Sequence, residues 1–93
     1  GHAERAEATL RAAAEAGATD AVVHNNLADL LARRGCRAAA LEQVNIAAGF
    51  AAQPGSSPSL AGAVEATRRE IEALPSFGAG EAACPRGPAA PAR

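Results

Sequence analysis

Residues that end helices divide this chain into short segments, and the positions of these residues constrain its fold more than any other feature of the sequence. Glycine stands at positions 17 and 35, the stretch QPGSSPS covers residues 53–59, and Pro75 follows the last periodic segment. Glycine readily adopts the left-handed conformation that closes a helix, and proline removes a backbone donor that a helix needs. The segments between these stops are rich in Ala, Leu, Glu and Arg, which favour helices, and none alternates like a strand. The sequence therefore predicts an all-α chain.

The segments begin at residues suited to helix caps. Asp20, or Thr19 beside it, can accept hydrogen bonds from the first turn of one helix, and Ser57 precedes Pro58 at the start of another. The final stretch, SFGAGEAACPRGPAAPAR, is rich in Gly, Ala and Pro without periodicity, so we expect it to be disordered. Four helices are expected at about residues 3–16, 21–34, 37–48 and 58–74, in a domain of residues 3–75 before a tail of residues 76–93.

Most of the apolar content is alanine, which limits the core that such helices can form. The 93 residues are 48% apolar, yet only 2% are aromatic. At about 25 cal/mol per Å² of buried apolar surface, small side chains contribute little, so we expect marginal stability or support from another domain or copy. The net charge of −1 gives no reason to expect nucleic acid as a partner. All nine basic residues are arginine, which together with the alanine is typical of a high-GC bacterial gene.

The sequence contains no targeting or membrane segment that we can identify. No apolar run approaches the ~20 residues that span a bilayer, so no membrane partner is expected. No signal-peptide pattern opens the chain, and Gly1-His2 resembles the scar of a cleaved tag, so we interpret residues 1–2 as foreign and the chain as an excised piece. The compartment, cytoplasm or periplasm, stays open.

Cys36 and Cys84 match no metal-ligand spacing, so neither a metal nor another cofactor is expected. A disulfide between them stays open, but Cys84 falls in the expected tail. We therefore expect two free thiols, with Cys36 packed among helices and Cys84 exposed.

Two segments carry apolar stripes at helical spacing. Val23, Leu27, Leu30 and Leu31 form such a stripe in the second segment. In residues 58–74 a stripe is spaced by four, three, four and three residues, which favours packing along another helix; it consists of Leu60, Val64, Thr67, Ile71 and Leu74. These positions predict a possible assembly seam for a second copy or another domain, made of Leu60, Val64, Ile71 and Leu74.

The third segment repeats a small–large–small residue pattern of the first segment at a fixed sequence distance. Ala40, Val44 and Ala47 stand 34 positions after Ala6, Leu10 and Ala13, which is the period of the tetratricopeptide repeat. Residues 21–53 resemble that family in the small and large residues of its two helices and in its turn glycine. The residues that carry the resemblance, and that would pack the repeat, are Leu27, Ala28, Leu31, Gly35, Ala40, Val44 and Ala47.

The resemblance implies a right-handed solenoid fragment of helix hairpins. Residues 3–19 resemble the second helix of a preceding repeat, and the fourth segment resembles the first helix of a following repeat or a capping helix. Two positions that are usually aromatic hold His24 and Val44, and the closing proline arrives late, at Pro54. His24 is then expected to pack in place of the aromatic ring.

In this family the first helix of each hairpin lines a groove that binds a peptide or a helix of a partner protein. The resemblance places five residues on that groove: Val22, Asn25, Asn26, Asp29 and Arg33. Asparagine offers a donor and an acceptor to a peptide backbone, and Arg33 can bind a carboxylate. The simpler interpretation of Asp29 and Arg33 is a surface ion pair one turn apart.

Arginines on both sides of Gly35 suggest a different hypothesis, a helix–turn–helix that binds DNA. No wider basic face would contact phosphates, and arginines near a helix end also complement its dipole. Only three side chains of the recognition helix would reach base edges: Arg37, Gln43 and Asn45.

His24, Asp29 and Cys36 are residue types found in nucleophilic catalysis, but nothing near Cys36 indicates a pocket or an oxyanion site. The sequence therefore predicts a non-catalytic, tetratricopeptide-like module for protein–protein interaction. The alternative is an assembly element that forms a homo-oligomer or docks on another domain.

Overall fold

The computed structural model describes residues 2–75 and residue 84. The described residues form four helices and no strand: α1 (His2–Glu15), α2 (Ala21–Arg33), α3 (Arg37–Ala51) and α4 (Pro58–Glu72). The all-α prediction is confirmed. The predicted disordered tail falls on residues 76–83 and 85–93, which lie outside the described residues.

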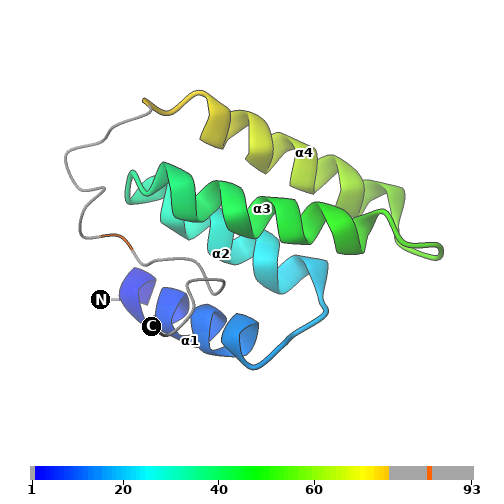
Figure 1. The fold of residues 1–93 in the computed structure, drawn as a ribbon, viewed down its shortest axis with the longest axis horizontal. Coiled ribbons are helices and arrows are strands. Elements are labelled where there is room, and N and C mark those ends of the chain that lie inside the picture. Colours follow the sequence, from blue (N-terminus) through cyan, green and yellow to red (C-terminus); the bar gives the residue numbers. More distant parts are fainter. Residues whose placement is uncertain (1, 76–83, 85–93) are drawn as a thin grey trace, which may run out of the picture.

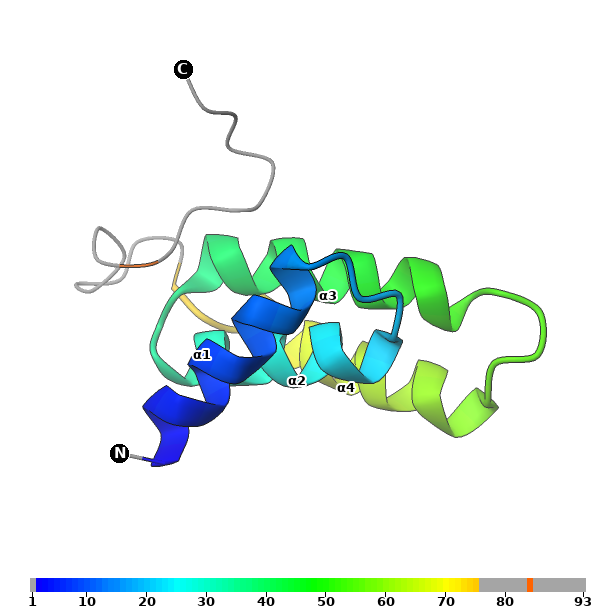
Figure 2. The ribbon, with the colours of Figure 1, turned by 90° about the horizontal axis from the view of Figure 1, so that it is seen from below.

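The other three helices pack around α2, which contacts each of them. Helices α2, α3 and α4 run alternately up and down beside one another, while α1 crosses α2 obliquely (Figures 1 and 2). Helix α4 packs against both members of the α2–α3 hairpin. The outcome is a short array in which α1 and α4 lie on opposite sides of α2 (Figure 1).

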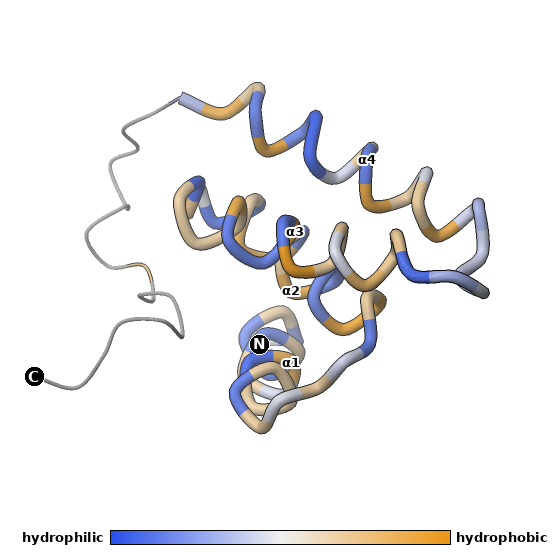
Figure 3. Tube along the Cα trace, turned by 45° about the vertical axis from the view of Figure 1, so that its right-hand side comes forward, coloured by the Kyte–Doolittle hydropathy of each residue, from blue (hydrophilic) through white to orange (hydrophobic). Residues whose placement is uncertain are grey.

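The core is made mainly of alanine and a few larger side chains. The largest fully buried side chains are Leu27, Val44, Ile71 and Cys36. Along α4, hydrophobic positions recur at nearly every turn between hydrophilic ones (Figure 3). Ala28, Ala40 and Ala47 are fully buried, and their small volume lets the helix backbones approach closely.

The turns follow from the residues that interrupt the helical pattern. Gly17 and Gly35 have φ of 90° and 81°, in the left-handed region that a Cβ disfavours. Side chains cap two of the three helices that follow a turn. At the start of α2, Asp20 Oδ1 accepts a hydrogen bond from Val22 N at 2.8 Å, and at the start of α4, Ser57 Oγ accepts one from Ser59 N at 3.2 Å. Cys36 precedes α3 without a capping side-chain bond.

Helix α3 is one turn longer than the sequence predicts, since it continues through Gly49 to Ala51 instead of ending at Ala48. Ala51 is buried, so tertiary packing outweighs the low helix propensity of Gly49.

The prediction of two free thiols is wrong, because Cys36 and Cys84 form a disulfide with their Cα atoms 5.6 Å apart. Cys36 lies in the core, and Cys84 is partly buried against it. The sequence separation of 48 residues concealed the pairing, since distance along the chain does not report distance in space.

Candidate interaction surface

The outer face of α2 carries the five residues predicted to contact a partner. Val22, Asn26 and Arg33 are exposed there, and Asp29 is partly exposed between them. Positions 22, 26, 29 and 33 form one line along the helix, because they differ by three or four residues. Asn25 borders this line but is only partly exposed, and its Oδ1 is enclosed without a hydrogen-bond partner among the described residues.

The C-terminal half of this line faces α4 across a shallow depression. Asp29 and Arg33 form an ion pair of 3.1 Å, and the Arg33 side chain is 74% exposed. Glu70 of α4 has no ion-pair partner among the described residues. The depression is lined by Asp29, Ala32, Arg33, Glu70 and Leu74. We use the name α2 face for the exposed line on α2 (Val22, Asn26, Asp29 and Arg33) together with Glu70 and Leu74 of α4.

Small residues of α4 leave this surface open. Ala66 and Ala63 are exposed and lie one and two turns before Glu70, respectively, on the same side of the helix. On this side of α4 the residues ahead of Glu70 therefore expose small side chains.

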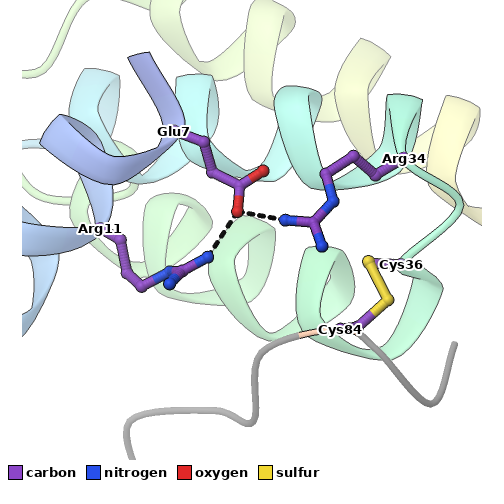
Figure 4. Close-up of a disulfide and its surroundings, with 5 residues drawn as sticks. All are labelled: Glu7, Arg11, Arg34, Cys36 and Cys84. Carbon is purple, nitrogen blue, oxygen red and sulfur yellow. Dashed lines mark hydrogen bonds and ion pairs between the residues drawn. A yellow bond between two sulfur atoms is a disulfide. The ribbon is translucent and has the colours of Figure 1, made fainter. Parts of the chain in front are cut away.

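On its other side α2 is joined to α1 by a buried carboxylate. Glu7 is the buried residue of α1, and its Oε2 accepts hydrogen bonds from Arg11, at 2.5 Å, and from Arg34 (Figure 4). Arg34 ends α2, so this ion pair ties the two helices together beside the Cys36–Cys84 disulfide (Figure 4). A second depression lies here, lined by His2, Ala3, Glu4, Glu7, Leu30, Arg33 and Arg34.

His24 is buried at 3% exposure, in the place that the resemblance gives to an aromatic ring. Its Nε2 lies 2.8 Å from the Ala18 carbonyl and its Nδ1 2.8 Å from Oε1 of the buried Gln43. The His24 and Phe50 rings are 5.7 Å apart. The ring thus fills core space and joins α2 to α3 and to the loop before α2.

The residues of the possible assembly seam pack inside the chain. Val64 and Ile71 are buried at 3% and 0% exposure, and Leu60 and Leu74 are partly buried against the same core. Helices α2 and α3 cover them, because α4 folds back onto the hairpin. The residues predicted to pack against a second copy are therefore covered by the chain's own helices.

The side chains named for DNA recognition are engaged within the fold. Gln43 is buried against His24, and Asn45 accepts a hydrogen bond of 2.7 Å from Arg68. Helix α3 packs against both α2 and α4, and its polar residues join it to these two neighbours. The catalytic set imagined from the sequence is likewise divided, since Cys36 is in the disulfide and His24 bonds Gln43.

The residues predicted to pack the repeat lie together between α2 and α3. Gly35 adopts its left-handed turn, and the other six are buried to 2% exposure or less: Leu27, Ala28, Leu31, Ala40, Val44 and Ala47.

Within residues 2–75 and at residue 84, no helix is long and apolar enough to cross a membrane. The same residues contain no group of three or more His, Cys, Asp or Glu arranged to hold a metal ion.

No family model, curated protein or solved structure matches this chain.

Sequence reasoning missed two acidic residues that shape the surface around α2. Glu7 gave no sign of burial, because charged residues of a short amphipathic helix are normally exposed. No pattern in the sequence singled out Glu70, and only the packing of α4 on α2 brings it beside Asp29 and Arg33.

Proposed function

We propose that this chain is a non-catalytic protein–protein interaction module of the tetratricopeptide type, which binds an extended peptide or a helix of a partner along the α2 face. The observation that carries the proposal is the exposed line of Val22, Asn26, Asp29 and Arg33 on α2. This line contains four of the five residues that the resemblance places in the partner groove.

The packing order supports the repeat interpretation. In such a solenoid the first helix of a hairpin contacts the second helix before it, its own partner and the first helix that follows. Helix α2 has these three contacts, with α1, α3 and α4.

The chemistry of the surface suits a peptide. Asn26 is exposed and offers both a donor and an acceptor, which are the groups that pair with a backbone amide. Among the described residues Arg33 is held only by a surface ion pair worth about 0.3 kcal/mol, so a ligand carboxylate competes for it at little cost. Val22, at 45% exposure, supplies an apolar contact at the other end of the line.

The proposal is tested by selecting peptides from a random library on the immobilised chain. The affinity of the selected peptides is then measured for the wild-type chain and for its variants. Asn26→Ala with Arg33→Ala should weaken binding at least about tenfold, as expected when two contacts at an interface are removed. Arg69→Ala is a matched control, since Arg69 is 78% exposed and pairs with an acid four residues earlier, as Arg33 does.

Unchanged affinity in the double variant, or the same loss in Arg69→Ala, would exclude the α2 face. Failure to enrich any peptide would count against the function itself.

A further inference from the structure

We propose that the Cys36–Cys84 disulfide is a redox-sensitive latch. In the oxidised chain it fastens residue 84 to the turn between α2 and α3. Reduction releases residue 84 and leaves the four helices folded. This inference does not depend on the proposed function.

Cys36 is the fixed half of the latch. Its side chain is 1% exposed and belongs to the core. Its backbone N–H donates to the Leu31 carbonyl at 2.9 Å, and its carbonyl accepts from Ala40 N at 2.9 Å. Gly35 N–H donates to the Ala32 carbonyl at 2.9 Å in the same turn. None of these bonds involves Cys84, so the position of Cys36 does not require the disulfide.

Cys84 is the releasable half. It is only partly buried, and it belongs to none of the four helices. The more exposed sulfur is the one that an external thiolate reaches, because attack on a disulfide needs access to the sulfur.

Reduction by a dithiol proceeds in two thiol–disulfide exchanges. One thiolate of the reductant attacks Sγ of Cys84, the Cys36–Cys84 bond breaks, and Cys36 leaves as a thiolate that takes up a proton. The second thiolate of the reductant then attacks the mixed disulfide and releases Cys84, which also takes up a proton. The reductant becomes a disulfide and the protein gains two electrons and two protons. Reducing cytosol favours the open form, and oxidising compartments favour the closed one.

The helices have contacts of their own that survive the opening. Glu7 and Arg34 join α1 to α2, and His24 with Gln43 joins α2 to α3. Val64 and Ile71 hold α4 in the core. The disulfide adds no contact between any two of these helices.

The test compares the oxidised chain, the chain reduced with dithiothreitol and the variant Cys84→Ser. Without reductant, alkylation under denaturing conditions should add no mass. After reduction the far-UV circular dichroism should keep its helical intensity, and native alkylation should modify Cys84 at least about tenfold faster than Cys36, because Cys36 keeps its place among the folded helices. Cys84→Ser should have the helical intensity of the reduced chain and should not respond to dithiothreitol.

Alkylation of both cysteines before reduction would overturn the latch, because the bond would then not form. Loss of helical intensity on reduction would make the disulfide a staple of the fold instead. Equal alkylation rates would show that Cys36 is released together with Cys84.

Discussion

His24 joins three segments of the chain through one buried ring. The Ala18 carbonyl can only accept, so Nε2 of His24 carries the hydrogen of that bond. The Gln43 amide complements Nδ1, since an amide can turn either its oxygen or its nitrogen towards the ring. A phenyl ring at this position would fill similar space but would satisfy neither neighbour.

We therefore expect His24→Phe to lower the free energy of unfolding by about 2 kcal/mol, because it leaves the Gln43 amide and the Ala18 carbonyl without a partner. Adding Gln43→Leu should recover about half of this loss, since one unpaired group is then removed. Urea denaturation of the two variants checks both values. Wild-type stability in His24→Phe alone would show that these bonds contribute nothing net.

At the scale of single residues, the sequence identified packing more readily than polar pairing. The expectation that His24 takes the place of an aromatic ring agrees with its burial beside Phe50. Its partner Gln43 is 19 residues away, and no spacing rule connects the two. The sequence did not predict the partners of Glu7 and Cys84 for the same reason. Arg34 and Cys36 become their neighbours only after the helices pack.

At the scale of the element, helix starts were predictable because their cause is local. The sequence left Asp20 and Thr19 as alternative caps for α2, and Asp20 accepts the bond from Val22 N. The end of α3 was less predictable, because it depends on the burial of Ala51 against the rest of the fold. The surface around α2 was predictable on α2 itself, whereas Glu70 and Leu74 came from a helix whose docking the sequence did not specify.

Asp20→Ala should lower the free energy of unfolding by about 1 kcal/mol, because the first turn of α2 loses its side-chain acceptor. Thr19→Ala is the control, since Thr19 is exposed and does not cap the helix, and its effect should stay within about 0.5 kcal/mol. Thermal or urea unfolding distinguishes the two. A larger loss in Thr19→Ala would mean that the cap is shared.

At the scale of the whole molecule, the described outer surfaces of the array are small and polar. The exposed positions of α4 are Ser, Ala, Gly, Glu and Arg, together with Pro58. Val22 is the one large apolar side chain exposed among the described residues. The exposed side of α4 therefore presents no large apolar side chain against which a further helix could pack.

We therefore expect the chain to be monomeric from micromolar to millimolar concentration, because Val64 and Ile71 are covered by α2 and α3. Sedimentation equilibrium checks this directly. A stable dimer would revive the assembly hypothesis and place its interface on a surface other than the core side of α4.

The disulfide also makes part of the chain a closed covalent ring. The ring runs from Cys36 through α3 and α4 to Cys84 and leaves α1 and α2 outside it. A protease that cuts the loop between Ala52 and Ser57 opens the ring without dividing the protein into two molecules. A pull applied to both termini extends α1, α2 and the residues after 84, while α3 and α4 carry no load until the disulfide is reduced. Mechanical strength in this chain therefore depends on its redox state.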